Sequence, residues 1–135
     1  MDGDSFHSRQ NIAKMREGIV LNDEDRAPWL RALQEAIRHW ISQNEDVVLA
    51  CSALKQRYRD MLRIDRQVRL VYLRGSYSLI ASRLAGRTGH FAGLNLLDSQ
   101  FDALEEPSGD VLVIDVAAPP DTIVARIHSE LGLSK

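Results

Sequence analysis

Apolar residues follow two alternating patterns along the chain, short continuous runs and longer stretches of helical period. The runs are rich in β-branched residues and predict three strands, Val47 to Ala53, Val68 to Leu73 and Asp110 to Ala117. The first and third runs are almost continuously apolar, which is typical of strands in a parallel sheet covered on both faces. The middle run alternates more, which favours a place nearer an edge of the sheet.

The stretches of helical period lie before, between and after these runs. The strongest begins at Asp23 and repeats apolar residues at three- and four-residue steps as far as Ile41. Further helices are predicted at Ser8 to Glu17, Leu54 to Ile64, Tyr77 to Leu84, Leu94 to Leu104 and Asp121 to Leu131. This alternation predicts a single layered α/β domain over residues 1–135, with right-handed crossovers.

Composition narrows the class of protein. A chain of 135 residues, 44% of them hydrophobic, suits one core, and a net charge of -2 leaves no basic excess for a nucleic acid or an anionic membrane. No apolar run approaches the length of about 18 residues that a membrane span needs. The single cysteine, Cys51, excludes an intrachain disulfide, favours a reducing, cytoplasmic location, and is expected to be an inert core residue.

Two carboxylates open the chain on either side of a glycine. An extended backbone would place Asp2 and Asp4 on one side, where they could hold a hydrated magnesium ion or accept a hydroxyl proton. The alternative is an acidic, disordered N-terminus. His7, Asn11 and Lys14 follow at helical steps, so they could share one face that holds a polyhydroxy acid, or could simply form a solvated face.

Basic residues stand at three other places that could meet an anion. Arg26 precedes a Pro-Trp pair and could form a carboxylate fork, although a charged helix start explains it equally. Lys55 follows the first strand, where open α/β sheets gather ligands. Arg83 and Arg87 lie in a segment with three glycines, residues 83–93, whose composition suits a closing loop that neutralises a transferring phosphoryl group or, alternatively, a solvated surface.

Together these stretches resemble the gluconokinase family, a branch of the P-loop kinases related to shikimate and nucleoside-monophosphate kinases. The resemblance runs in the family's order through Asp2 to His7, Asn11 to Met15, Leu21 to Leu30, Cys51 to Lys55, Tyr58 to Asp60, Gly89 to Phe91 and Ser99 to Pro107. It implies the three-layer α/β fold of the nucleoside-monophosphate-kinase type, with a parallel sheet and a lid at about residues 83–95. It also implies transfer of the γ-phosphoryl group of ATP, with Mg²⁺, to the terminal hydroxyl of gluconate.

The resemblance further implies a role for each candidate residue. Asp2 would help to hold magnesium, and Asp4 would orient or deprotonate the attacking hydroxyl. The gluconate site would be lined by His7, Lys14, Arg26, Lys55, Arg59 and Gln100. Arg83 and Arg87 of the lid would touch the nucleotide phosphates, and the turn from Val116 to Pro119 would lie near adenine. A homodimer is common in the family.

One family feature is absent from the printed sequence. Family members begin with a strand, a loop of the form G-x-x-G-x-G-K-[ST] and a helix, and the loop cradles the β- and γ-phosphates. No such motif occurs here, and the family's sheet places that strand at its centre, beside the runs Val47 to Ala53 and Val68 to Leu73. A chain that starts at Met1 is therefore expected to be poorly stable and nearly inactive.

Three hypotheses follow. The first is a gluconokinase with about 35 further residues upstream, roughly one βαβ unit. The second is a non-catalytic remnant or pseudokinase that binds a sugar acid or a partner chain. The third is a kinase for another small sugar acid, because pocket arginines and hydroxyl-binding groups do not by themselves fix substrate stereochemistry.

Overall fold

The structure is a computed structural model that describes residues 1–85 and 94–133. A 3₁₀ turn, η1 (Gly3–Phe6), opens the chain. The helices are α1 (Arg9–Arg16), α2 (Asp23–Ser42), α3 (Gln56–Leu62), α4 (Tyr77–Ala85), α5 (Leu94–Ala103) and α6 (Pro120–Leu131), and the strands are β1 (Val71–Arg74) and β2 (Leu112–Asp115).

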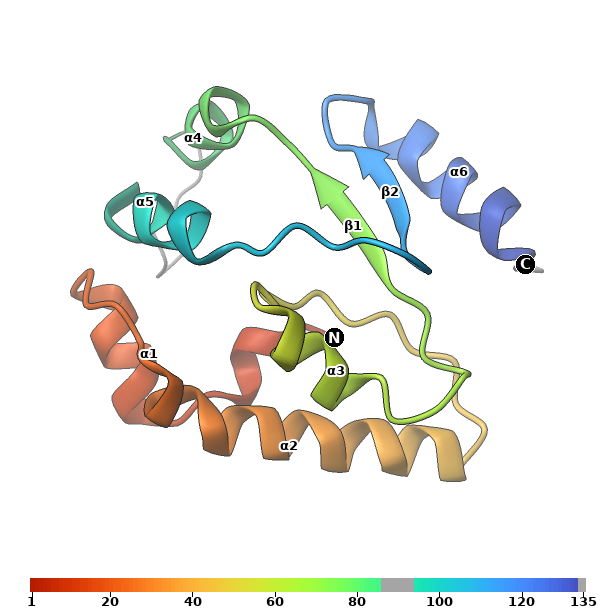
Figure 1. The fold of residues 1–135 in the computed structure, drawn as a ribbon, viewed down its shortest axis with the longest axis horizontal. Helices are drawn as coiled ribbons and strands as arrows, with labels where there is room; N and C mark the ends of the chain where they lie inside the picture. The colour runs from red at the N-terminus through yellow and green to blue at the C-terminus, as the bar shows by residue number, and fades with distance from the viewer. Residues whose placement is uncertain (86–93, 134–135) are drawn as a thin grey trace.

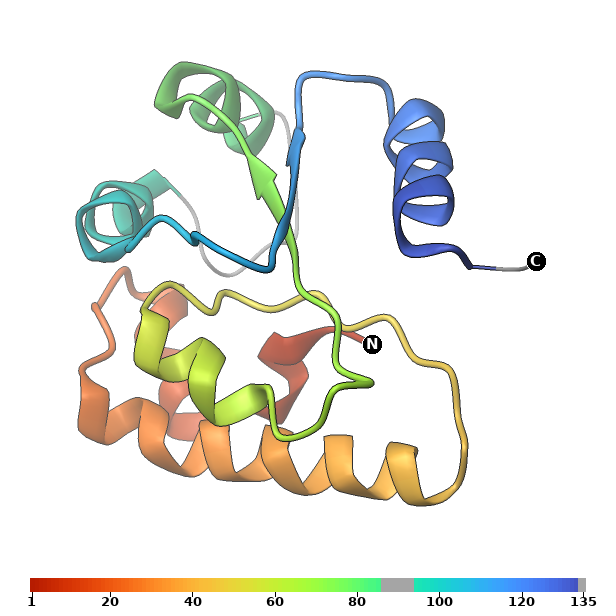
Figure 2. The ribbon, with the colours of Figure 1, turned by 45° about the vertical axis from the view of Figure 1, so that its right-hand side comes forward.

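The two strands lie between layers of helices. β1 pairs with β2 in parallel, with Val71 opposite Leu112 and Arg74 opposite Asp115. Helices α4 and α5 lie on one side of this pair and α6 on the other, while η1, α1, α2 and α3 form a second group below them (Figures 1 and 2). The strand and helix order is that of the predicted α/β domain.

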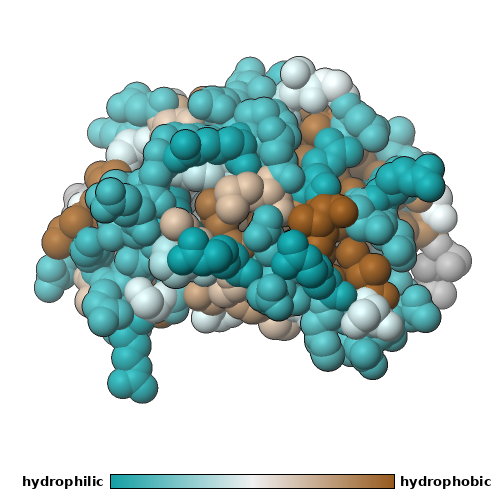
Figure 3. All heavy atoms as spheres, turned by 60° about the horizontal axis from the view of Figure 1, so that its bottom comes forward, coloured by the Kyte–Doolittle hydropathy of each residue, from teal (hydrophilic) through white to brown (hydrophobic). Residues whose placement is uncertain are grey.

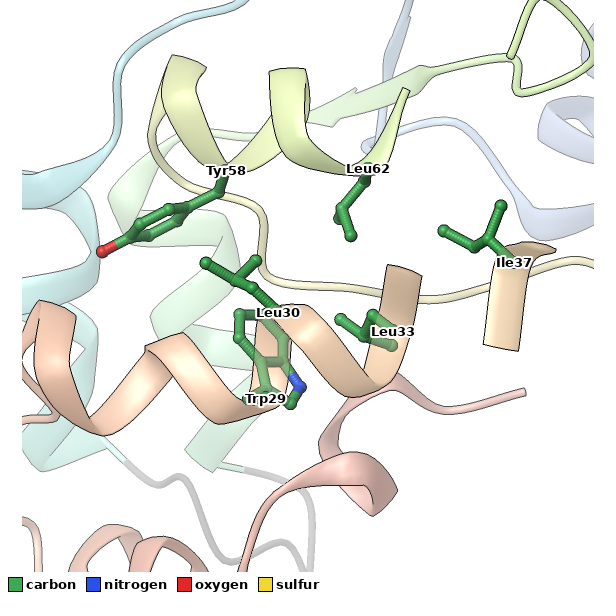
Figure 4. Packing of buried hydrophobic residues seen from close by; sticks show 6 residues of the cluster. All are labelled: Trp29, Leu30, Leu33, Ile37, Tyr58 and Leu62. Carbon is green, nitrogen blue, oxygen red and sulfur yellow. The ribbon is translucent and has the colours of Figure 1, made fainter. Parts of the chain in front are cut away.

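Helix α2 is the longest helix of the lower group. Asn22 caps it, because its side chain accepts from the Asp25 amide while the Asp25 side chain accepts from the Asn22 amide. Its apolar face packs against α3 and forms a buried cluster, seen in Figure 4, of Trp29, Leu30, Leu33, Ile37, Tyr58 and Leu62. The strongest helical pattern in the sequence therefore became the helix that supports the candidate site.

Truncating the centre of this cluster is expected to destabilise the domain. The Leu33 side chain has no exposed area, so Leu33→Ala removes buried methyl groups and leaves a cavity, lowering the free energy of unfolding by about 2–5 kcal/mol. Chemical denaturation monitored by circular dichroism measures this loss. Arg31→Ala, on the exposed face of the same helix, should change the value by less than about 0.5 kcal/mol. Equal effects of the two variants would contradict the assigned core.

The prediction of a strand from Val47 to Ala53 is wrong for this structure. Only Ala50 of this run bridges to another segment, in parallel to Asp2. The Gly3 amide donates to the Ala50 carbonyl at 2.6 Å, and the Ala50 amide donates to the Met1 carbonyl at 3.0 Å. A strand needs a hydrogen-bonded partner along its length. Here residues 1–3 are the partner, and they form one bridge only.

Glycine is required at this bridge. A Cβ atom at Gly3 would lie 2.8 Å from the Ala50 oxygen, closer than real Cβ atoms approach. The two backbones therefore meet only because residue 3 has no side chain. This contact fixes the start of the chain, and with it η1, beside the segment that leads into α3.

The structure therefore has two separate parallel pairings, β1 with β2 and Asp2 with Ala50. The carbonyls of Leu70, just before β1, and of Arg74 accept hydrogen bonds from the β2 segment. The backbone groups of Val71 and Leu73 therefore point to the opposite edge of β1. No ladder in the described residues joins that edge to residues 47–51. Apolar side chains are exposed beside these open edges, including Val48 at 85% and Leu73 at 49%. This is the disruption expected when a central strand is absent.

The remaining predicted elements are confirmed with small shifts. All of the predicted helices form, and β1 begins three residues later than the apolar run that predicted it. Figure 3 shows that the face on the α2 side is mostly hydrophilic, with apolar side chains reaching the surface near its middle and right. In the part of the chain that the structure describes, no helix is long and apolar enough to cross a bilayer.

Candidate active site

A cavity of about 220 Å³ lies where the lower helix group meets α4 and α5. Asp4, His7 and Arg26 line it from η1, its C-terminal flank and α2. Ser52, Ser99 and Gln100 add hydroxyl and amide groups, and several apolar side chains complete the wall. The cavity thus combines an acid, an imidazole, a cation and neutral hydrogen-bonding groups, which suits a small polar anion.

The two N-terminal aspartates have different positions. The Asp2 side chain caps η1, since its Oδ1 accepts from the Asp4 amide at 3.0 Å. Asp4 lies within η1 and lines the cavity, whereas Asp2 does not. Burial raises the pKa of Cys51 to about 12, and the charges of Asp4 and then Asp2 add to that rise. Both carboxylates therefore act on one small region, and the raised pKa agrees with the prediction of an inert thiol.

His7 is held in a stacked geometry. Its ring lies parallel to the Trp29 ring, with centroids 4.5 Å apart and an interplanar angle of 11°. Its Nδ1 lies 3.2 Å from Nδ2 of Asn11, although His7 precedes α1 and Lys14 pairs with Asp25 instead of sharing this contact. Burial lowers the pKa of His7 to about 4, and the charge of Arg26 adds to the effect. His7 is therefore neutral at pH 7.

Arg26 is the only cation among the described residues that line the cavity. Its Nη1 donates to the Tyr58 hydroxyl at 3.2 Å, and its guanidinium carbon lies 5.6 Å from the centre of the Tyr58 ring. None of the ion pairs in the described part of the chain includes Arg26. Its charge is thus available to an anion in the cavity, as the carboxylate-fork hypothesis requires.

Asp23 gathers the neighbouring cations instead. It accepts from the Tyr58 hydroxyl, from Lys55 Nζ at 3.2 Å, and from the Arg57 guanidinium. The Tyr58 hydrogen bond, followed by the Lys55 hydrogen bond, holds the pKa of Asp23 well below its usual range. Lys55 therefore contacts a carboxylate of its own chain and does not line the cavity, so its predicted contact with gluconate stays a prediction.

Two other predicted ligands lie away from the cavity wall. Lys14 pairs with Asp25 at 2.9 Å. Arg59 is 4% exposed and donates to the backbone oxygens of Ala53, Leu54 and Glu105. These bonds tie α3 to the segments on both sides of it, so the structure gives Arg59 a supporting role. Binding of gluconate by Lys14 or Arg59 stays a prediction.

The remaining predicted residues belong to the upper helices. Gln100 lines the cavity, as predicted for a substrate ligand. Arg83 Nη1 donates to the Val116 carbonyl at 2.8 Å, which joins α4 to the turn predicted to lie near adenine. Arg87 and most of the predicted lid at 83–95 lie outside the described residues. The nucleotide contacts of both arginines stay predictions.

Sequence reasoning missed three residues that shape the site. Trp29 was expected on the apolar face of a helix, and Tyr58 was named only within the family resemblance. Both are buried, and each also contacts a cavity residue. Asp23 read as part of an acidic helix start. The aromatic rings next to basic residues, in Arg-Ala-Pro-Trp and Lys-Gln-Arg-Tyr-Arg, were the available sequence signal.

Known proteins resemble this chain over most of its length. No protein-family model matches the chain. It is 44% identical over 129 residues to the thermoresistant gluconokinase of Escherichia coli K12, covering 93% of this chain and 74% of that protein. It is 46% identical over 111 residues to the thermosensitive gluconokinase of the same strain, covering 82% and 59%. The gluconokinase of Arabidopsis thaliana is 42% identical over 142 residues, covering 94% and 75%.

Solved structures agree with these relatives. A sugar kinase from Janibacter sp. HTCC2649, in an unliganded structure, superposes with a TM-score of 0.90 at 39% identity, covering 99% of this chain and 79% of that one. A gluconokinase from Sinorhizobium meliloti 1021 gives a TM-score of 0.79 at 42% identity, covering 97% and 79%. The fold is that of a sugar kinase with the P-loop kinase fold, which confirms the predicted fold class. More specifically, the chain belongs to the gluconokinase family.

Proposed function

We propose that these residues form the sugar-acid-binding part of a gluconokinase that transfers the γ-phosphoryl group of ATP to the terminal hydroxyl of D-gluconate. The observation that carries this proposal is the cavity in which Arg26 is accompanied by Asp4 and His7. Gluconate is a carboxylate with a chain of hydroxyl groups. Among the described residues, the one guanidinium that lines the cavity suits the carboxylate, and neutral donors and acceptors suit the hydroxyls.

Each cavity residue has a chemical role in this proposal. Arg26 binds the carboxylate, and Ser52, Ser99 and Gln100 bind hydroxyl groups. Asp4 accepts the proton of the attacking hydroxyl while the hydroxyl oxygen bonds to the γ-phosphorus. Transfer then breaks the bond between the γ-phosphorus and its bridging oxygen, and ADP leaves with the electron pair.

Kinases of this family use a nucleotide and a metal, and we assign these as ATP and Mg²⁺. The donor set fits a hydrated magnesium ion, because that ion binds one or two carboxylates together with water and substrate phosphates. Asp2 would help to hold the ion, and the bound ion would neutralise charge on the phosphates. Arg83 and Arg87 would contact the phosphates beside it, with the turn from Val116 to Pro119 near adenine.

The printed sequence contains no G-x-x-G-x-G-K-[ST] motif, and it spans 59–75% of the three curated relatives described above. The proposed enzyme is therefore this chain joined at its N-terminus to a strand, phosphate-binding loop and helix, hereafter the completed chain. The open edges of β1 and of residues 47–51 support a place for that strand. We further propose a cytoplasmic location and a homodimer.

The same open edges favour a second candidate, a non-catalytic remnant that binds a sugar acid or a partner chain. Calorimetric titration of the 135-residue chain tests both candidates, although sugar-acid binding by itself is compatible with either. The proposed function predicts gluconate binding with a dissociation constant between about 1 μM and 1 mM, the usual range for enzyme substrates. Absence of gluconate binding would contradict it, and micromolar binding of ATP with magnesium would contradict the remnant hypothesis.

Activity of the completed chain provides the second arm of this test. A coupled assay across several aldonic acids should show turnover that is fastest with gluconate. Faster turnover of another aldonic acid would identify a kinase for that acid instead. No turnover of any sugar acid by a folded completed chain would overturn the proposed function.

A further inference from the structure

Asn11 holds a buried amide between the His7 ring and helix α2. The residue is 6% exposed, and its Nδ2 donates to the backbone carbonyl of Asp25 at 2.7 Å. A carbonyl oxygen can only accept, so the amide nitrogen, and not the amide oxygen, must face Asp25. The hydrogen-bond partner therefore fixes the orientation of this amide, which coordinates alone leave ambiguous.

The same nitrogen determines where the His7 proton lies. Nδ2 carries two hydrogens, and its second neighbour is His7 Nδ1 at 3.2 Å. Since Nδ2 has no lone pair to offer, Nδ1 must be the acceptor and must carry no proton. In a neutral imidazole the proton then resides on Nε2, at the side of the ring away from Asn11.

The ring itself is held in place by α2. It stacks on Trp29, whose Nε1 donates to the Gly3 carbonyl at 2.8 Å. His7 lies between the cavity and a second hollow of about 390 Å³, and Asn11 lines only the second hollow. The Nδ1 edge of the ring therefore faces the second hollow, and the Nε2 edge is left for the cavity.

We propose that Asn11 is a positioning residue that fixes His7 as a neutral Nε2–H donor toward the cavity, so that His7 binds a substrate oxygen and serves neither as a cation nor as a base. The assignment of the proton stands on Asn11 geometry alone. The assignment of a gluconate hydroxyl as the bound oxygen rests on the proposed function.

The surrounding charges are consistent with a neutral ring. Asp4 is near His7 on η1, and α2 contributes Glu24, Asp25 and Arg26. Lys14 on α1 neutralises Asp25. Protonation would place an N–H of His7 against the N–H of Asn11 and would break their hydrogen bond. The low pKa of His7, which follows from burial and then from Arg26, agrees with this cost.

Nitrogen NMR of the 135-residue chain, labelled with ¹⁵N-histidine, tests the proton assignment without any ligand. We expect His7 to show an unprotonated Nδ1 and a protonated Nε2 between about pH 5 and 8. A proton on Nδ1, or titration at the ordinary value of about 6.5, would overturn the proposal.

Asn11→Asp tests the cause, because it replaces the donor with an acceptor. The proton should then move to Nδ1, and His7 should titrate above about 6.5 because the new carboxylate favours the imidazolium. Asn44→Asp makes the same chemical change at an exposed position and should leave the His7 spectrum unchanged. An unaltered His7 spectrum in folded Asn11→Asp would overturn the role of Asn11.

Two substitutions of His7 keep the proposal testable if Asn11→Asp does not fold. The glutamine amide reaches the place of Nε2, whereas the shorter asparagine amide reaches the place of Nδ1. By calorimetry, His7→Gln should bind gluconate within about tenfold of wild type, and His7→Asn at least about tenfold more weakly than His7→Gln. The reverse order would refute the Nε2–H donor.

The pH dependence of gluconate binding provides a further test, because the proposal predicts the direction in which affinity changes. Because the binding form of His7 is neutral and its pKa is about 4, wild-type affinity should not fall as pH decreases from about 8 to 5. In Asn11→Asp it should fall over that window, since the ring becomes protonated. If the NMR result holds but gluconate does not bind, the proposed function fails while the proton assignment stands.

Discussion

Replacing Asp4 with asparagine is expected to lower kcat/KM of the completed chain for gluconate by at least about 10²-fold, which corresponds to about 2.7 kcal/mol of transition-state stabilisation. Asparagine keeps the size of the side chain and removes its ability to accept a proton. Because the lost step is proton transfer, the decrease should appear in kcat with KM little changed. Steady-state kinetics with a coupled assay measures both constants.

A matched control separates chemistry from folding. Asp46→Asn makes the same change at an exposed position outside the cavity and should leave both constants unchanged. Thermal unfolding should show that Asp4→Asn is folded, because the cap of η1 is supplied by Asp2 and not by Asp4. Wild-type turnover in Asp4→Asn would refute the role of Asp4 as proton acceptor.

The helices could be predicted from the sequence because their causes are local. The apolar face of α2 and the cap at Asn22 are encoded within a few residues of one another, and the structure has both. The run from Val47 to Ala53 has the composition of a buried strand, but composition supplies no partner. Its one bridge, at Ala50, shows that a strand depends on residues far away in the sequence.

The sequence predicted which residue types belong to the candidate site better than it predicted their contacts. Asp4, His7 and Arg26 were expected in one site and do line one cavity. Lys55 was expected there for the same reasons, yet Asp23 holds it. A positive charge in a sequence attracts any nearby carboxylate, and only the fold decides whether that carboxylate belongs to the chain or to a ligand.

The further contribution of the structure is the arrangement of supporting residues. The spacing of His7 and Asn11 predicted a shared face, but the identity of the donor required the Asp25 carbonyl, fourteen residues later in the chain. Nor does the sequence indicate that the Tyr58 hydroxyl lies between Arg26 and Asp23. Such roles arise from distances between helices, which sequence periodicity does not contain.

Replacing Arg26 with alanine is also expected to lower kcat/KM for gluconate by at least about 10²-fold, in a different way. In the proposed function Arg26 binds a carboxylate far from the transferred group, so its interaction exists before and during phosphoryl transfer. The loss should therefore appear mainly as a higher KM, with a smaller change in kcat. The same variant of the 135-residue chain should bind gluconate correspondingly more weakly in calorimetry.

Two controls identify what Arg26 contributes. Arg38→Ala removes an exposed arginine from the same helix, one that pairs with Glu35, and should leave KM unchanged. Arg26→Lys keeps the charge but loses the planar fork, so it should recover only part of the affinity. If Arg26→Ala binds gluconate as wild type does while its fold is intact, the carboxylate lies elsewhere. The cations held by Asp23 would then be the next candidates, because Asp23→Asn would release them to an incoming anion.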